Sequence, residues 1–189
     1  MIVHILATHT VSSYLTTTAL TRALSMRRAN AGRNVCVIAQ DRRQKHIWSA
    51  SDIKLQCPPY CINGEHVVSV LESADSNAQD IFIHTTAAGD PCKLASRAHI
   101  NIAHIEAAAL NRATRAGFID ILVPLAAANK PDAVLLAIDT TAANEEQIQA
   151  FLALGAGLQI PALLIPEAGQ GDSNATVLYR AIFNMRHLL

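Results

Sequence analysis

The sequence predicts a single α/β domain over residues 1–189, built on a mostly parallel sheet that is flanked by helices on both faces. Short runs rich in Val, Ile and Leu alternate along the chain with longer helical patterns, which is the order of βαβ units with right-handed crossovers. Hydrophobic residues make up 51% of the chain but aromatic residues only 4%, so the core must consist mainly of Ala, Leu, Ile and Val. Strands buried under Ala-rich helices have this composition.

The predicted strands are short and apolar throughout, as expected of strands buried on both faces. They cover residues 2–7, 34–39, 80–84, 119–124, 133–138 and 162–165. Gly32 provides a C-terminal stop for the first helix, and Asn144 followed by two acidic residues marks a helix N-terminus. The predicted helices cover residues 17–31, 67–74, 91–116, 144–154 and 175–188.

Residues 8–18 join the first strand to the first helix, which is the setting of a phosphate-binding loop. Such a loop needs glycines that let backbone N–H groups approach phosphates, and a lysine that neutralises charge. The chain has no glycine before Gly32 and no lysine before Lys45. The sequence therefore predicts the architecture of a nucleotide-binding protein without its chemistry.

Ligands of parallel sheets bind outside the carboxyl ends of the strands, so residues 8–18, 39–46 and 84–92 form the expected site. In this order, the three segments resemble the ParA/MinD family of deviant-Walker P-loop ATPases. Thr16, Thr17 and Thr18 match the threonines that close the family's Lys-Gly-Gly-x-Gly-Lys-Thr-Thr-Thr loop. Residues 35–44 resemble the family's strand ending in Asp-x-Asp-Pro-Gln. Residues 80–89 resemble its strand ending in Ile-Asp-Thr-Pro-Ala-Gly, and residues 118–125 resemble its strand ending in Leu-Ile-Pro.

The resemblance fails at the positions that carry the family's chemistry. The two lysines fall on Thr10 and Leu15, and the carboxylates of the second and third segments fall on Ala39 and His84. The loop glycines fall on Val11, Ser12 and Tyr14. Phosphoryl transfer depends on cations placed around the phosphates, so we expect no ATP hydrolysis, no catalytic residue and no metal site. We expect no cofactor and at most weak binding of ATP and magnesium, in a vestigial pocket that consists of Thr10, Ser12, Ser13, Thr16, Thr17, Asp41 and His84.

Histidines and cysteines give weaker signals. Cys57 and Cys61 flank two prolines, with His66 nearby, but the prolines and the missing fourth ligand make a poor metal site. Cys36 is predicted to lie in the core, while His4, His99 and His104 are predicted to be surface or partly buried residues, the last two on a helix. His9 and His84 should lie at strand ends, where a pair of histidines could bind an anion.

The charge pattern argues against strong non-specific DNA binding, because 15 basic residues balance 15 acidic ones. The arginines at 22, 27, 28 and 33 read as a solvated helix face, and Arg42, Arg43 and Lys45 should lie near the pocket. Arg180 and Arg186 form only a thin patch for DNA. The first residues are typical of a strand rather than of a signal peptide. No apolar run reaches the ~18 residues that a membrane helix requires. We therefore expect a cytoplasmic protein without membrane contact.

The resemblance implies a non-hydrolysing regulatory or scaffold protein in plasmid partition, plasmid stability or the control of conjugative transfer. It would act through a protein partner, with DNA as a weaker ligand. Thr10 in place of the signature lysine implies a monomer or an ATP-independent homodimer, with residues 102–109 as a candidate apolar interface. The alternative is an α/β enzyme or flavodoxin-like protein that binds another phosphate-containing ligand at the strand ends, through Ser12, Ser13, Thr16 and Thr17.

Overall fold

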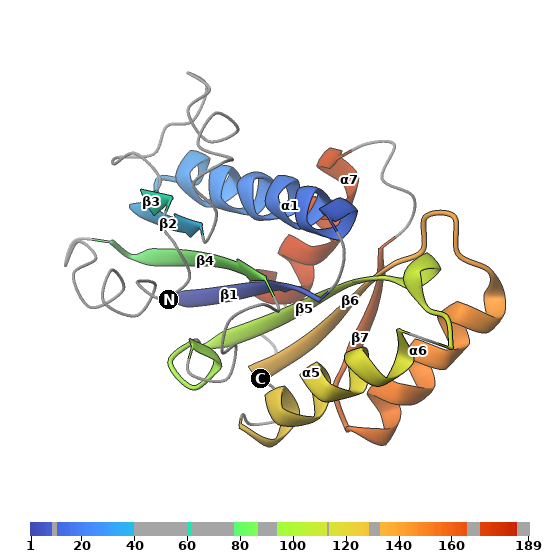
Figure 1. Ribbon diagram of the computed structural model, residues 1–189. Helices are drawn as coiled ribbons and strands as arrows, with labels where there is room; N and C mark the ends of the chain where they lie inside the picture. Colours follow the sequence, from blue (N-terminus) through green and yellow to red (C-terminus); the bar gives the residue numbers. More distant parts are fainter. Residues whose placement is uncertain are drawn as a thin grey trace.

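The computed structural model describes residues 1–8, 11–39, 60–61, 78–86, 94–112, 114–128, 133–165 and 171–184. Seven strands in these ranges form one sheet in the order β3-β2-β4-β1-β5-β6-β7, and all neighbouring strands are parallel (Figure 1). This confirms the predicted α/β class. The strands are β1 (Ile2–Ala7), β2 (Val35–Ala39), β3 (Tyr60–Cys61), β4 (Asp80–Thr86), β5 (Ile100–Glu106), β6 (Val134–Asp139) and β7 (Ala162–Ile165).

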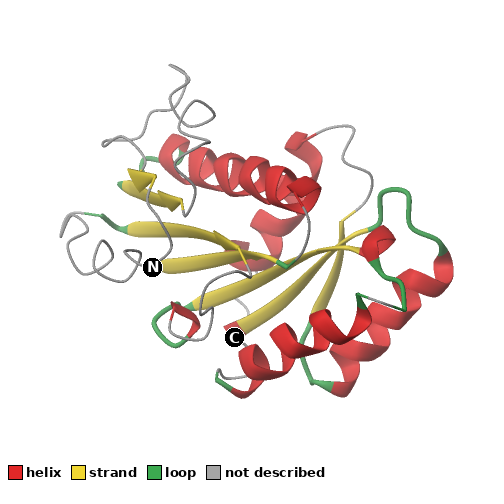
Figure 2. Cartoon of the chain, viewed as in Figure 1, coloured by secondary structure: helices red, strands yellow, loops and turns green. Residues whose placement is uncertain are grey.

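Helices cover both faces of the sheet, as predicted (Figures 1 and 2). On one face lie α1 (Val11–Asn30) and α7 (Gly171–Tyr179), which continues as a π-helical segment, η5 (Arg180–Asn184). On the other face lie α5 (Arg115–Ala127) and α6 (Glu145–Gly157), preceded by the short 3-10 turn η3 (Ala107–Ala109). Each face has its own apolar cluster, with Leu20 and Leu24 of α1 in one and Phe118 and Phe151 in the other.

The central strand β1 lies between β4 and β5. In this register Ile5 is paired with His84 of β4, and Ala7 is paired with His104 of β5. A flavodoxin-like sheet places the first two strands of the chain next to each other. Here β4 separates β1 from β2, so the flavodoxin-like alternative is wrong.

Two predicted elements are wrong. Residues 91–116 were expected to be one helix, but Ile100–Glu106 is the strand β5, with Ile100 to Ile105 all buried. The alanines that follow at 107–109 give the segment a helical composition, yet a run that is buried on both faces between β1 and β6 must pair as a strand. Residues 102–109 are therefore strand and 3-10 turn rather than a helical interface.

Residues 119–124 were expected to be a strand and instead lie in α5. The helix buries Phe118, Leu122 and Leu125, which are spaced as one helix face. Ile119 and Val123 lie on the exposed side, so apolar residues occur all round the helix and hide its period. The resemblance of residues 118–125 to a strand of the ParA/MinD family is therefore wrong.

Among the remaining described elements, the other predicted strands and α6 are close to their predicted positions, whereas α1 begins at Val11, six residues before the predicted start at residue 17, and β3 was not predicted. Gly32 has a φ of +80° just after α1, as a helix stop requires. Asn144 caps α6: its side chain accepts a hydrogen bond from the Gln147 N–H at 2.9 Å, and the Gln147 side chain accepts one from the Asn144 N–H at 3.0 Å. The predicted helix at 67–74 lies outside the described residues, and the predicted helix at 175–188 is α7 followed by η5.

Arginines of α1 support the fold rather than forming a solvated face. Arg28 donates a hydrogen bond to the buried carboxylate of Asp80 at 2.7 Å and also stacks over Phe183 at 4.3 Å. Burial opposes ionisation of Asp80, but the hydrogen bond and charge of Arg28 outweigh it and lower the pKa of Asp80. Arg27 donates to the Thr176 hydroxyl at 2.6 Å, which ties α1 to α7. The prediction of a solvated face is wrong for these two residues.

Two further observations concern Cys36 and the apolar lengths of the helices. Cys36 is buried, as predicted for a core residue. No helix in the described ranges is long and apolar enough to cross a membrane.

Candidate functional site

Helix α1 starts where the sequence resemblance places a phosphate-binding loop. β1 ends at Ala7 and α1 begins at Val11, so residues 11–15, which align with the family's Gly-Gly-x-Gly-Lys, already lie in the helix. Without glycine in this stretch, nothing in the sequence favours an open loop over a helical turn. Only the first four N–H groups of a helix lack an internal acceptor, so from Leu15 onward the amides are committed to the helix.

The second turn of α1 is bonded to the carboxyl end of β5. Thr17 is fully buried, and its hydroxyl lies 2.8 Å from Nδ1 of His104. Thr16 donates a hydrogen bond to Oε1 of Glu106 at 3.4 Å. Thr16 and Thr17 of the expected pocket therefore both contact β5. Ser12 and Ser13 lie in the first turn of α1, while Thr10 and Asp41 lie outside the described residues.

His84 lies in β4, on the face of the sheet that α1 covers, and is fully buried. Burial, together with the repulsion that His4 and His104 exert when they are protonated, lowers the pKa of His84 to about 3. At neutral pH this imidazole carries no positive charge that would attract an anion. His84 therefore gives no support to the anion-binding hypothesis, and His9, its expected partner, lies outside the described residues.

Two further histidines that were expected at the surface or partly buried are completely buried in the sheet. Nδ1 of His4 lies 2.9 Å from Oδ1 of Asn101, and Nε2 lies 2.7 Å from the hydroxyl of Thr85. Because the amide oxygen can only accept, Nδ1 carries the proton and Nε2 accepts from Thr85. Burial lowers the pKa of His4 to about 4.

His104 is also held by a side-chain hydrogen bond, because its Nδ1 lies 2.8 Å from the hydroxyl of Thr17. Burial lowers the pKa of His104 to about 4, although the nearby charge of Asp139 acts in the opposite direction. The prediction is thus wrong for His4 and His104. It is right for His99, which is exposed, but His99 lies in a bend before β5 and not on a helix.

Two carboxylates at the same edge of the sheet were missed by the sequence analysis. Glu106 ends β5 and Asp139 ends β6, and the two residues are paired in register. Asp139 is nearly buried, and its Oδ1 accepts a hydrogen bond from the Thr141 N–H at 2.8 Å. Asp139 follows a continuous apolar run, which was a usable signal, whereas Glu106 was hidden by the helix expected at 91–116.

These side chains define the chemistry of the described part of the strand ends. It combines neutral imidazoles, threonine hydroxyls and two carboxylates, a set that does not neutralise phosphate charge. Across the described residues, no group of three or more His, Cys, Asp or Glu side chains is placed to hold a metal ion. This statement does not cover the possible metal site at Cys57, Cys61 and His66, because the side chains of these residues are not described.

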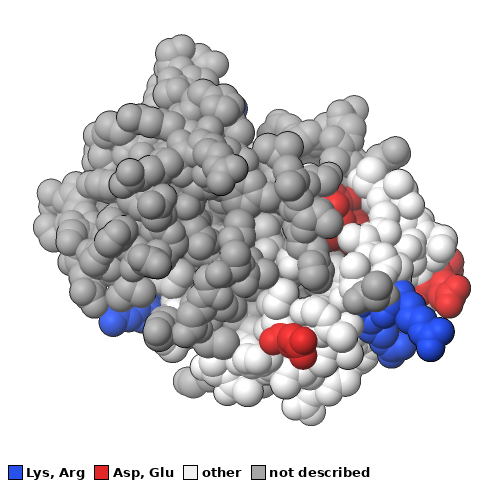
Figure 3. Space-filling model, viewed as in Figure 1, with Lys and Arg blue, Asp and Glu red and all other residues white. Residues whose placement is uncertain are grey.

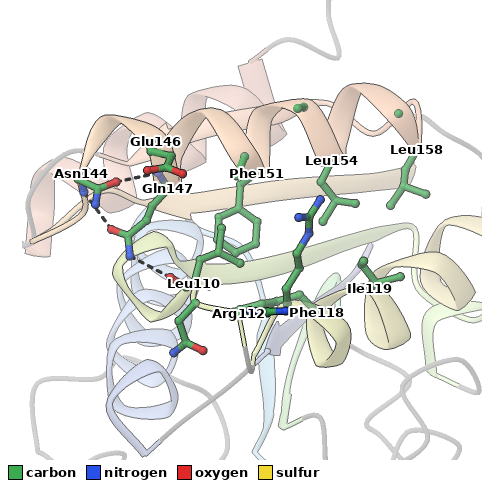
Figure 4. A pocket seen from close by; sticks show the side chains of 15 residues that line it. Leu110, Arg112, Phe118, Ile119, Asn144, Glu146, Gln147, Phe151, Leu154 and Leu158 are labelled. Atoms are coloured by element: carbon green, nitrogen blue, oxygen red, sulfur yellow. Dashed lines mark hydrogen bonds between the residues drawn. The ribbon is translucent and has the colours of Figure 1, made fainter.

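A groove of about 700 Å³ opens elsewhere, between α5 and α6, on the face of the sheet opposite α1 (Figures 1 and 4). Its walls include Phe118, Phe151 and Leu154, and Arg112 and Arg115 also line it. No local sequence pattern indicates this groove, because it depends on α5 being a helix.

The described charges show little that would favour DNA. On the face shown in Figure 3, the described Lys and Arg side chains form small separate groups and no continuous basic surface. Arg180 is exposed in η5, whereas Arg42, Arg43, Lys45 and Arg186 lie outside the described residues.

Comparison with known proteins identifies the fold. No protein-family model matches the chain, and no curated protein matches it. Among solved structures, the chain is similar to one described as "Crystal structure of LAO/AO transport system kinase", with a TM-score of 0.57 and 11% sequence identity. The match covers 99% of this chain and 59% of that chain, so the chain spans about three fifths of its length. The likeness supports a P-loop NTPase fold as a class, without favouring the ParA/MinD family within it.

Proposed function

We propose that the chain is a non-hydrolysing regulatory or scaffold protein that uses a P-loop NTPase fold to bind a protein partner. One observation carries the proposal: α1 begins at Val11, so a helix occupies the positions at which a phosphate-binding loop would lie. The helical backbone fixes the direction of the amides at residues 11–14 and commits those from Leu15 onward to internal hydrogen bonds, so the chain cannot wrap around a triphosphate as an open loop does.

The charges at the strand ends support the same conclusion. Phosphoryl transfer requires cations around the phosphates and a carboxylate that supports the metal. The chain has no lysine before Lys45, and neutral His84 stands where the family's metal-supporting carboxylate falls. Glu106 and Asp139 add negative charge at the neighbouring strand ends. This arrangement disfavours a nucleotide with its magnesium ion.

The finer part of the proposal rests on the resemblance to the ParA/MinD family. It favours a cytoplasmic role in plasmid partition, plasmid stability or the control of conjugative transfer. Because Thr10 replaces the lysine that crosses the family's nucleotide-bound dimer, we expect a monomer or an ATP-independent homodimer. Contact with DNA is expected to be weak, since the net charge is zero.

The test is nucleotide binding by calorimetry, with ATP, ADP and GTP and their magnesium complexes, alongside an assay of phosphate release. We expect no heat of binding at millimolar nucleotide and no release. A matched variant replaces residues 10–15 with the family's Lys-Gly-Gly-x-Gly-Lys, and we expect it to gain measurable binding. Micromolar binding or turnover by the natural chain would overturn the proposal. A flavin that co-purifies with the chain would favour the enzyme alternative instead.

A further inference from the structure

The groove between α5 and α6 is a feature of the described surface that the proposed function does not use. Its apolar wall runs along α6 and meets the first half of α5 (Figure 4). Phe118 and Phe151 pack edge to face beneath it, with ring centroids 4.9 Å apart. Ile119, Leu154 and Leu158 also line it. Burial of such a surface against an apolar partner is favourable.

The groove is open to solvent along its length. Ala150, Ala153 and Gly157 line it and are exposed on α6, and Ile119 is 36% exposed on α5. One turn further on, Val123 is 43% exposed, so the apolar surface continues beyond the groove. Small residues on α6 leave room for another backbone to approach. A small molecule in such a groove would stay largely wet, whereas small-ligand sites bury most of their ligand. An occupant with a polar outer face fits better.

Two arginines and one glutamate supply the charge in the lining of the groove. Arg112 and Arg115 line it close to the start of α5, and both are exposed. The ion pairs found among described residues all involve Asp80, so neither arginine is engaged in one. Glu146 is the acidic side chain in the lining. Two guanidinium groups against one carboxylate favour an occupant that places a carboxylate against the arginines.

The dimensions match one short helix. The groove follows α6 from Glu146 to Leu158, and at ~1.5 Å per residue this is about 18 Å, or roughly three turns of a partner helix. Helices that dock in grooves bury apolar side chains at positions i, i+3 or i+4, and i+7.

We propose that the groove between α5 and α6 binds one amphipathic helix of a partner protein, with a carboxylate of that helix at Arg112 and Arg115. The apolar face of the helix lies over Phe118, Phe151 and Leu154. The proposal rests on the proposed function, because it gives the partner-binding role a surface and a ligand chemistry.

The test selects 16-residue helical peptides on the full chain, from a display library with randomised apolar and charged positions, and measures binding by fluorescence anisotropy. Two variants of α6 form a matched pair: Ala153→Glu places a charge in the groove, and Ala156→Glu places the same charge on an exposed position outside it. Arg115→Glu tests the contact between the arginines and the peptide carboxylate. Arg180→Glu, on the opposite face of the sheet, is the control.

We expect the selected peptides to carry an acidic residue at the position that lies against Arg112 and Arg115. Ala153→Glu should weaken binding at least tenfold, and Ala156→Glu should change it less than twofold. Arg115→Glu should weaken binding, and exchange of the peptide's acidic residue for Lys should restore it. The proposal fails if no peptide is enriched, if both α6 variants bind alike, or if dodecanoate displaces every peptide, which would indicate a small amphipathic anion. The peptide result is independent of the nucleotide titration, so each proposal can fail alone.

Discussion

At the scale of single residues, the polar groups under α1 are used as structural ties. The Thr17 hydroxyl bonds His104, and on the opposite face of the sheet His4 joins Asn101 and Thr85. Buried polar groups stabilise a fold only when they are hydrogen-bonded, and their loss leaves partners unsatisfied. These histidines hold strands and a helix in place as neutral imidazoles. They belong to the core and not to an exposed catalytic site.

Stability should therefore fall in mild acid. His4, His84 and His104 have folded pKa values of about 4, 3 and 4. In an unfolded chain a histidine binds a proton near pH ~6.5. Between that pH and about 4, the unfolded chain binds protons that the folded chain does not. The free energy of unfolding then drops by up to about 1.4 kcal/mol per pH unit for each histidine. Urea unfolding at several pH values between 7.5 and 4.5 measures this loss.

One variant separates this effect from other titrations. His84→Leu should flatten the dependence by roughly a third, since one of the three sites is removed. The window above pH 4.5 also excludes Asp80, whose lowered pKa acts only in stronger acid. A stability that stays constant from pH 7.5 to 4.5 would contradict the neutral buried state of these imidazoles.

At the scale of elements, α6 shows how packing sets the role of a residue type. Gly155 is buried against β6 and the turn after α6: a methyl group there would lie 3.0 Å from Cδ1 of Leu136 and 3.2 Å from the carbonyl oxygen of Ile160. At Gly157, two residues on, a methyl group would meet nothing within 4 Å. The first glycine allows the helix to lie close to the sheet, and the second has no such role.

The two glycines give a matched prediction. Gly155→Ala should destabilise the chain by about 1–2 kcal/mol, because overpacking against the buried Leu136 exceeds the gain in helix propensity. Gly157→Ala should leave stability unchanged or raise it by up to about 1 kcal/mol, because Ala favours a helix. Thermal or urea unfolding of the two variants under identical conditions checks this. Equal effects of the two substitutions would show that α6 does not approach β6 as described.

At the scale of the whole molecule, the sheet is organised around β1. It has a neighbour on each side, and Val3 to Ala7 are at most 2% exposed. Among the described strands, β7 pairs only with β6, and Leu164 is 42% exposed. Position in the sheet thus separates a protected centre from an edge that opens more easily.

Native-state hydrogen exchange should reproduce this order. Amides of β1 and β5 should exchange only through global unfolding, because each of these strands has partners on both sides. Amides of the edge strand β7 should exchange faster, through local opening. Mass spectrometry of peptides covering the three strands provides the comparison. Exchange of residues 100–106 as fast as that of β7 would contradict their position beside β1.

The sequence by itself determined the α/β class, five of the seven described strands and the extent of α6 to within a few residues, because apolar runs and capping residues such as Asn144 are local signals. It placed the start of the first helix at residue 17, six residues after the observed start of α1 at Val11. It also located the missing lysines and glycines, which argue against a phosphate site. Only the tertiary structure decided that β5 is a strand and α5 a helix. Both segments are apolar at most positions, so their periods are masked, and their neighbours in the fold settle their conformation. The same holds for the buried histidines, for Glu106 and Asp139 at one edge, and for the groove between α5 and α6. Each depends on residues far apart in the chain, whose proximity no local pattern contains.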